Sequence, residues 1–293
     1  MHQAVLPVST PERVAQVAQL SCLVEASVPK PGNVSFGRGF ADADYLDFLA
    51  SAAAIGSAMV QAAQESVGSV ILRAVQETRR WTTTNTNLGI VLLLAPLARA
   101  ACLGGPLRPR LGQVLRGLTV EDARLAYEAI RMANPGGLGH VEAQDVREPP
   151  TVSLREAMAL AAERDAVARE YVTDYAITFE VGAPALREAR SCGLGREQAV
   201  LWTYLRILSK VPDTLIARKR GWREALEASA RAQEILALGD LAGTEGRRRL
   251  SAFDRWLRRL GNARNPGTTA DLVCASLFVV LWEDGGAWWR KQG

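Results

Sequence analysis

The sequence predicts an all-α protein, folded as one multi-helix bundle domain over residues 1–293. Ala, Leu, Glu and Arg are abundant while aromatic residues make up only 6% of the chain, a composition that favours helices. Apolar residues recur at helical spacing along most of the chain, and no stretch shows the period-two alternation of a strand. No repeat of fixed period and no linker-like tract divides the chain, so we interpret the Gly- and Pro-rich stretch 136–150 as a loop within one domain.

The first half of the chain predicts helices with clear starts and stops. Proline at the first helical position predicts a helix Pro11–Ser27, which must end before Pro29 because prolines remove backbone donors. Asp42 or Asp44 is the expected cap of a second helix, which continues to about residue 65. The other helices expected here cover residues 67–80, 88–102 and, after a capping box at Thr119, 120–132. The helix over 88–102 is apolar nearly all round and is expected at the centre of the bundle.

The second half predicts one long helix and four shorter ones. Ser153 is expected to open the long helix, which carries Asp165 and ends near Glu180. The four further helices are expected at residues 195–211, 221–238, 244–261 and 268–282. The arginines of the third of these indicate a solvated helix face rather than a phosphate pocket: Arg247, Arg248, Arg249, Arg255, Arg258 and Arg259. Tryptophans near the C-terminus indicate either an apolar cap or the contact of a homodimer: Trp282, Trp288 and Trp289.

Charge and cysteine content predict a cytoplasmic protein without a membrane segment. The 35 basic and 31 acidic residues leave a net charge of +4, which an anionic small molecule explains as well as a nucleic acid, so we expect no nucleic-acid partner. Four scattered cysteines without C-x-x-C spacing indicate reduced thiols. The longest apolar stretch, 90–103, is interrupted by Pro96 and Arg99 and is too short to span a bilayer. His140 has no second histidine beside it and is not expected to be catalytic.

A first candidate binding segment, which we call loop one, is Pro29-Lys30-Pro31-Gly32-Asn33. The prolines would hold Lys30 beside Gly32, where a ligand could closely approach the backbone, and Asn33 can both donate and accept hydrogen bonds. This combination is typical of a phosphate site. Glu25, at the end of the preceding helix, could take a magnesium ion or a ribose hydroxyl. The alternative is a proline-stiffened turn with an exposed lysine.

A second candidate, loop two, comprises residues 82–89 at the start of the apolar helix. Its hydroxyl and carboxamide side chains, among them Asn85, Thr86 and Asn87, lie where free amides and the positive end of the helix dipole attract anions. Gly89 would allow a ligand to approach the first turn. The alternative, helix capping, accounts for one such side chain but not for three threonines and two asparagines together.

Carboxylates on or beside apolar helix faces form a third group: Asp44, Asp47, Asp165, Asp213 and Asp271. Asp213 is followed by Arg218 and Lys219 about one helical turn later, and Asp271 follows a Pro-Gly turn that opens a helix. For Asp165 the alternative is a structural ion pair with Arg169. Together with the two loops, these groups offer metal-binding oxygens, cations and helix N-termini, as a magnesium-bound triphosphate requires.

The order and spacing of these motifs resemble the triphosphoribosyl-dephospho-CoA synthase family, in its divergent archaeal-type branch. The matching segments are Lys30-Pro31-Gly32, Asp44 to Phe48 with Ser51, Asn85-Thr86-Asn87-Leu88-Gly89, and Pro266 to Leu272. The resemblance spans about Glu25 to Leu281. It implies an all-α enzyme that transfers a triphosphoribosyl group from ATP to the 2′-hydroxyl of 3′-dephospho-CoA and releases adenine. The chain departs from lyase-associated members at Asn33-Val34-Ser35, and at Asn87-Leu88, where those members carry His-Lys.

The resemblance also implies roles for the candidate residues. Asp165 or Asp271 would be the catalytic carboxylates, close to the developing positive charge on the ribose and to the attacking hydroxyl. Glu25 and Asp213 would bind Mg²⁺, which enters as Mg-ATP. The residues expected to bind the nucleotide are Lys30, Gly32, Asn33, Asn85, Thr86, Asn87, Gly89, Arg218 and Lys219.

Three other functions remain open at the level of the sequence. One is ribosyl-phosphate transfer to a precursor of a methanopterin-like cofactor. Another is a non-catalytic nucleotide-binding protein, and the third is a magnesium-dependent hydrolase of N-glycosides or nucleotides.

Overall fold

The computed structural model describes residues 10–137, 139 and 143–290, and within them it is built from helices. His140 lies outside the described residues. No strand occurs in the described part of the chain, apart from an isolated bridge between Ser35 and Arg38. The predicted all-α class is confirmed. In chain order the elements, with η1 a 3₁₀ turn and η2 a π-helix, are α1 (Pro11–Ser27), α2 (Tyr45–Ala54), α3 (Gly56–Val60), η1 (Gln61–Ala63), α4 (Val67–Arg79), α5 (Leu88–Cys102), α6 (Leu107–Arg116), α7 (Val120–Ala133), α8 (Leu154–Ala159), α9 (Ala166–Val172), η2 (Thr178–Gly182), α10 (Ala183–Ser191), α11 (Arg196–Lys210), α12 (Thr214–Arg220), α13 (Trp222–Leu236), α14 (Thr244–Arg258), α15 (Gly267–Glu283) and α16 (Gly286–Trp289).

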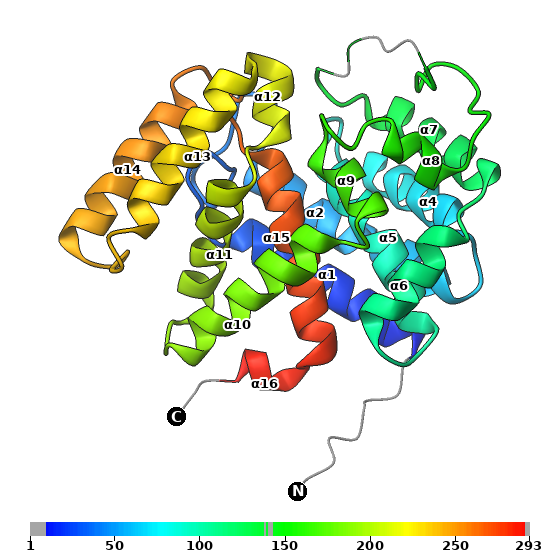
Figure 1. Ribbon diagram of the computed structural model, residues 1–293, viewed down its shortest axis with the longest axis horizontal. Coiled ribbons are helices and arrows are strands. Elements are labelled where there is room, and N and C mark those ends of the chain that lie inside the picture. The colour runs from blue at the N-terminus through cyan, green and yellow to red at the C-terminus, as the bar shows by residue number, and fades with distance from the viewer. Residues whose placement is uncertain (1–9, 138, 140–142, 291–293) are drawn as a thin grey trace, which may run out of the picture.

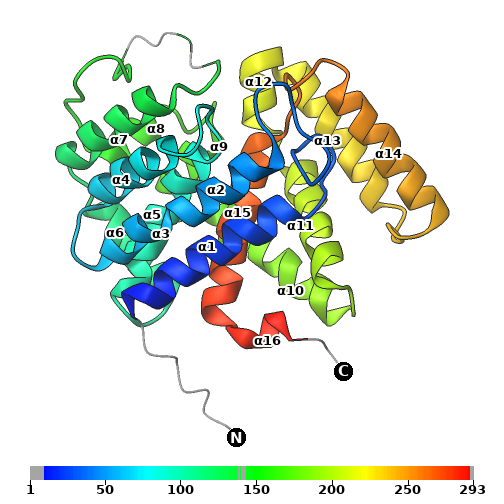
Figure 2. The ribbon, with the colours of Figure 1, turned by 180° about the vertical axis from the view of Figure 1, so that it is seen from behind.

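Three helices, α1, α5 and α15, form the centre of the bundle. α15 runs through the middle of the molecule, with α4 to α9 on one side and α10 to α14 on the other (Figure 1). From behind, α1 crosses in front of α15, and the segment that follows α1 reaches the helices α12 to α14 (Figure 2). Every residue of α15 from Leu272 to Leu281 is buried. This segment has no polar face, and a helix that is apolar all round is expected to be buried. The central position predicted for residues 88–102 is confirmed by α5, in which Leu93 and Leu94 are fully buried.

Tyrosine side chains complete the hydrogen bonding of α5 at a proline. Pro96 has no amide hydrogen, so the carbonyl of Leu92 loses its helical donor. The Tyr171 hydroxyl donates to that carbonyl at 2.6 Å, and the Tyr175 hydroxyl donates to the Leu93 carbonyl at 3.0 Å. Both tyrosines are fully buried. The segment that packs against α5 therefore supplies the hydrogen-bond donor that Pro96 lacks.

The single long helix predicted from Ser153 to near Glu180 is wrong, because Asp165 caps a new helix. α8 ends at Ala159, and the Asp165 carboxylate accepts hydrogen bonds from the amides of Val167 and Ala168, at 2.9 and 3.3 Å. An aspartate that bonds its own backbone two and three residues ahead favours a helix start over helix continuation. The interruption turns the Asp165 carboxylate towards the helices packed beside α9.

A second interruption follows α9. Asp174 and Tyr175 have φ of 49° and 58°, in the left-handed region. Beyond them, the buried Glu170 carboxylate accepts the amides of Ile177 and Thr178, at 3.0 and 2.7 Å, as the π-helix η2 begins. Burial raises the pKa of Glu170 to about 7, although these hydrogen bonds oppose the shift. The chain therefore bends twice in the region predicted to be one rod.

Other helix predictions need smaller corrections. The second helix breaks at Ile55, where a Cβ at Gly56 would lie 2.5 Å from the Gln19 side chain of α1. The helix predicted at 221–238 is preceded by a separate helix, α12, that Asp213 caps. No helix was predicted at the positions of α6 and α10, which follow a Gly-Pro turn and the π-helix respectively.

The described residues include one stretch long and apolar enough to cross a membrane, Tyr45–Ala63, which has a mean hydropathy of 1.4 and is 39% buried inside the molecule. Helices α5 and α6, which are bent by 112° relative to each other, are long and apolar enough to cross a membrane only if they are counted together as one segment. Core helices of soluble proteins have the same length and composition, so this is weak evidence for a span. The absence of a membrane segment and a cytoplasmic location stay predictions.

Two of the C-terminal tryptophans pack within the chain. Trp282 stacks on Phe278, with ring centroids 6.3 Å apart, and Arg13 lies over its ring. Trp288 is buried beneath Arg190. These contacts favour the apolar-cap interpretation, and the homodimer stays a prediction.

We predict that Tyr171→Phe lowers the free energy of unfolding by about 1–3 kcal/mol, because the buried Leu92 carbonyl loses its donor. Tyr45→Phe, which removes an exposed hydrogen bond to Ser27, is the matched control and should cost less. Both are measured by urea denaturation. Pro96→Ala supplies a backbone donor, so it should reduce the cost of Tyr171→Phe. An equal cost in both backgrounds would contradict this account.

Candidate active site

A cavity of about 1020 Å³ lies between the two groups of outer helices and receives residues from both. Its size is at the upper end for ligand pockets, as a reaction of two substrates requires. Parts of both predicted loops line it, together with the N-terminal ends of α5, α9 and α15 and the charged end of α12. The predicted residues that line the cavity are Glu25, Asn33, Asn85, Thr86, Asn87, Gly89, Asp165, Arg218, Lys219 and Asp271.

Loop two forms the N-terminus of α5 and lines one wall of the cavity. Asn85 accepts the amide of Leu88 at 3.1 Å and so caps the helix. Asn87 donates its side-chain amide to Thr78 at 3.0 Å, and Thr86 bonds to Ser51 of α2 at 2.5 Å. These contacts fix the conformation of loop two. The amides of Gly89 and Ile90 have no acceptor among the described residues, so an anion in the cavity can bind there.

The floor of the cavity is the contact between α5 and α15 at Gly89. A Cβ at Gly89 would lie only 2.0 Å from Oδ2 of Asp271. The sequence predicted that a ligand approaches this glycine, but the closest approach is made by the Asp271 carboxylate. Gly89 is required because the Asp271 side chain of α15 occupies the space that a Cβ at position 89 would need.

Asp271 has an electrostatic environment unlike that of the other cavity carboxylates. Its side chain lines the cavity and has no hydrogen-bond donor among the described residues. Burial, and the nearby carboxylates of Glu25, Asp213 and Asp165, raise the pKa of Asp271 well above its usual value, while Arg218 opposes the shift. A neutral acid at the cavity floor is the physical consequence.

Asp165 and Arg218 form an ion pair at the side of the cavity. One Asp165 oxygen caps α9, and the other accepts the Arg218 guanidinium at 2.9 Å. The alternative pair with Arg169 does not form, since Arg169 donates instead to the Ala162 carbonyl. Nε of Arg218 is buried without a partner. Lys219 is half-buried beside it, and burial lowers the pKa of its ammonium. Asp165 is therefore paired with a cation of α12 while it caps α9.

Lys30, predicted to bind phosphate, is buried and does not line the cavity. Its ammonium lies 2.9 Å from the Glu25 carboxylate and donates to the carbonyls of Glu25 and Val28 at the end of α1. The side chain has 0% exposure. A cation at a helix C-terminus satisfies carbonyls that lack helical donors and interacts favourably with the dipole. Lys30 is a structural cap, and neither the predicted phosphate role nor the exposed-lysine alternative holds.

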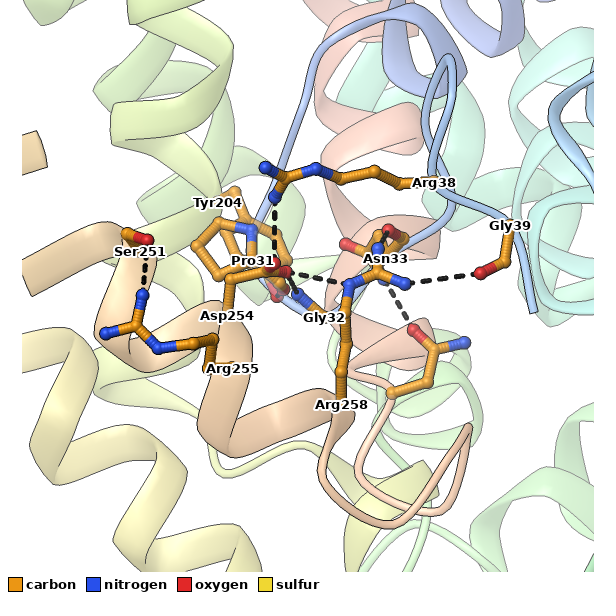
Figure 3. Close-up of polar contacts among 11 residues, drawn as sticks. Pro31, Gly32, Asn33, Arg38, Gly39, Tyr204, Ser251, Asp254, Arg255 and Arg258 are labelled. Carbon is orange, nitrogen blue, oxygen red and sulfur yellow. Dashed lines mark hydrogen bonds and ion pairs between the residues drawn. The ribbon is translucent and has the colours of Figure 1, made fainter.

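Gly32 is required for helix packing rather than for ligand approach. A Cβ there would lie 2.8 Å from Leu257 of α14 and 2.9 Å from Pro266, and its φ is +79°. The Gly32 amide donates to Asp254 of α14 at 2.8 Å (Figure 3). The Tyr204 hydroxyl donates to the Pro31 carbonyl at 2.6 Å. The back of loop one is therefore fixed to α14 and α11.

Asn33 is the residue of loop one that faces the cavity. Its side-chain amide donates to Asn265 at 2.7 Å, while its Oδ1 is buried without a donor. The Asn33 carbonyl accepts the Arg258 guanidinium, which also binds Asp254 at 2.9 Å (Figure 3). Arg258 thus holds the loop, in contrast to the solvated face predicted for the arginines of this helix. Among the described residues, the Asn33 Oδ1 is thus left without a hydrogen-bond partner at the edge of the cavity.

Asp213, predicted to bind metal, is saturated with protein donors. One oxygen accepts the amides of Leu215 and Ile216, and the other accepts the amide and hydroxyl of Thr269, all at 2.8–3.0 Å. It does not line the cavity. Burial raises its pKa and the four donors oppose the shift. Asp213 joins the starts of α12 and α15 and has no position for a metal ion.

Glu25, the other predicted metal ligand, lines the cavity but is paired with Lys30. No group of three or more described His, Cys, Asp or Glu side chains is placed to hold a metal ion. The residues present therefore do not fit a resident magnesium site.

Two cavity arginines, Arg79 and Arg164, were not among the site residues predicted from the sequence. The Arg79 guanidinium donates to the Thr83 carbonyl at 2.5 Å beside loop two. Arg164 lies in the turn before Asp165 and donates to the Leu160 carbonyl at 3.1 Å. Recognising Asp165 as a helix cap would have placed Arg164 in a turn rather than on a helix surface.

Comparisons with known proteins agree in one description. The model of the family described as ATP:dephospho-CoA triphosphoribosyl transferase matches residues 11–290. A relative from Stutzerimonas stutzeri (strain A1501), named "probable 2-(5″-triphosphoribosyl)-3′-dephosphocoenzyme-A synthase", is 28% identical over 288 residues and covers 92% of each chain. A relative of the same name from Pseudomonas fluorescens is 33% identical over 205 residues, 69% of this chain and 62% of its own. The crystal structure of a candidate triphosphoribosyl-dephospho-CoA synthase from Archaeoglobus fulgidus superposes with a TM-score of 0.64 at 30% identity, over 83% of this chain and 100% of that one.

We predict that Lys30→Ala lowers the free energy of unfolding by about 3–5 kcal/mol, because it leaves Glu25 buried without its partner. The double variant Lys30→Met with Glu25→Gln should lose less, since no buried charge remains. The exposed Lys210→Met is the control for the loss of a lysine. Denaturant midpoints measure all three. Unchanged stability combined with weaker binding of Mg-ATP would show that Lys30 contacts phosphate instead.

Proposed function

The chain belongs to the ATP:dephospho-CoA triphosphoribosyl transferase family, and from this premise we propose that it transfers the triphosphoribosyl group of ATP to 3′-dephospho-CoA and releases adenine. The observation that carries the proposal is the family match over residues 11–290, which includes every element that lines the cavity. The names of the relatives give no support to a pterin acceptor.

We assign the triphosphate of ATP to the polar wall, which consists of Asn33, residues 84–89, Arg218, Lys219 and Asp271. The free amides of Gly89 and Ile90 lie at the positive end of a 15-residue helix. Arg218 and Lys219, which both line the cavity, supply cationic donors. The N-terminus of α15, where Asp213 already accepts the Thr269 amide, lies on the same side of the cavity. This wall suits a chain of phosphates.

Magnesium enters as part of the Mg-ATP substrate. The triphosphate itself supplies the oxygen ligands that Mg²⁺ prefers, and the ion retains several waters in such complexes. Because Asp213 is saturated and Glu25 is paired, the protein contributes cations and amides to the phosphates rather than ligands to the ion.

The reaction exchanges two bonds at the anomeric carbon of ribose. The bond from C1′ to the adenine nitrogen breaks, its electron pair leaves with adenine, and the acceptor hydroxyl oxygen bonds to C1′. Asp165, paired with Arg218, accepts the hydroxyl proton and stabilises the positive charge on the ribose. Asp271, kept neutral by the carboxylates around it, donates a proton to adenine. One acid and one base thus balance the protons.

The transfer activity is tested by incubating the protein with Mg-ATP and dephospho-CoA. We expect adenine and a product that retains all three phosphates, in equal amounts, and no adenine when the acceptor is omitted. Adenine release with water alone would indicate a hydrolase. Binding of Mg-ATP without adenine release would indicate a non-catalytic protein, and either result would refute the proposal.

Asp271→Asn should reduce kcat by roughly 10²- to 10⁴-fold, the usual contribution of a general acid. In the wild-type enzyme, kcat should fall as the pH rises through the raised pKa of Asp271, because only the protonated form donates; the variant should lack this decline. An N7-methylated purine can leave without being protonated. A donor that carries one should therefore restore much of the rate lost in the Asp271→Asn variant. Asp42→Asn, a cavity carboxylate bonded to Asn262, is the matched control. No gain from the methylated donor would exclude the acid role.

A further inference from the structure

A second part of the cavity wall carries a run of apolar side chains beside the charged Arg164 and Asp165. It is built from α7, α8 and α9 and the turn between α8 and α9. We call it the apolar strip, and its residues are Ile130, Leu154, Met158, Leu160, Ala161 and Val167. The hydroxyl of Tyr127 beside it is already used, since it donates to the Gln144 carbonyl at 2.7 Å.

The strip runs from the interior to solvent. Leu154 is fully buried, Met158 is 9% exposed and Leu160 is 52% exposed. Trp222, at the start of α13, lines the same cavity and is 45% exposed. Large apolar side chains left open in a ligand cavity indicate that part of the ligand is apolar.

The strip meets the polar wall at Asp165. The turn that presents Leu160 and Ala161 ends at Asp165, and Val167 follows it in the first turn of α9. On its other side, Asp165 binds Arg218 of the polar wall. The turn is held in place because Arg169 donates to the Ala162 carbonyl at 3.2 Å and Arg164 to the Leu160 carbonyl. The proposed base therefore lies where the two walls join.

Resting on the function proposed above, we infer that the apolar strip binds the pantetheine arm of the acceptor. Dephospho-CoA is adenosine diphosphate esterified to pantetheine, a long chain with a gem-dimethyl group and two amides. The arm is flexible and largely apolar, so it can lie along a strip that adjoins Asp165 and includes the half-exposed Leu160. The hydroxyl that receives the triphosphoribosyl group belongs to the adenosine part, which then lies at Asp165.

The donor adenine is a poorer occupant of this strip. A purine is selected through hydrogen bonds to its edge, and the side chains of the strip have no free donor or acceptor. Adenine must also receive a proton from Asp271, which lies at the floor beneath Gly89 on α5. The strip therefore selects acceptors that carry a pantetheine arm, whereas the donor ATP is bound by the polar wall.

The test compares two acceptors that share the reacting hydroxyl, dephospho-CoA and ADP, which lacks the arm. The ratio of kcat/KM for dephospho-CoA to that for ADP measures what the arm contributes. Leu160→Ser should lower this ratio about tenfold, because the arm loses apolar contact area. Leu160→Met, which keeps that area, should retain the ratio. Leu160 is half-exposed, so neither variant threatens folding.

Leu226→Ser, at a half-exposed leucine of α13 outside the cavity, is the matched control and should leave the ratio unchanged. A ratio that Leu160→Ser does not change, or a rise in KM for ATP in its place, would overturn the assignment of the strip. Absence of transfer to both acceptors by the wild-type protein would instead refute the proposed function, so the two failures are distinguishable.

Discussion

The contact between α5 and α15 at Gly89 is the constraint on which the cavity depends. Two buried helices can approach this closely only because one contributes no side chain there. The approach leaves Asp271 as the cavity floor and brings the N-termini of α5 and α15 to the same space. Asp213 then fixes α12 to the start of α15 through four hydrogen bonds, which places Arg218 and Lys219 at the side of the cavity. The charge distribution of the site follows from this packing.

The sequence predicted the fold class and several helices closely, because their signals are local. Pro11 and Pro29 bound α1 at the predicted residues, and the nearly all-apolar sequence of α5 placed it at the centre. The errors occur where a side chain bonds to the backbone against helical propensity. Asp165 and Glu170 each end a predicted helix in this way, and such competition cannot be read from apolar periodicity.

For the site, most of the predicted residues come from segments that the structure brings to one cavity. Ten of the thirteen predicted residues line it, from both loops and from the starts of α9 and α15. Lys30, Gly32 and Asp213 do not, because each is occupied by a tertiary contact: the end of α1, the side of α14, or the start of α15. The residue type predicted that each side chain could bind a phosphate or a metal ion. The groups of the same chain that each residue contacts instead are known only from the structure.

The burial of Lys30 and Gly32 changes what their motif means when it is found in another chain. Both residues serve the assembly of the scaffold, since one closes α1 and the other seats the loop on α14. A protein that had lost catalysis would still need them in order to fold. Inheritance of the Lys-Pro-Gly pattern therefore marks descent and architecture, whereas retention of the carboxylates at positions 165 and 271 is the better guide to whether a descendant still performs chemistry.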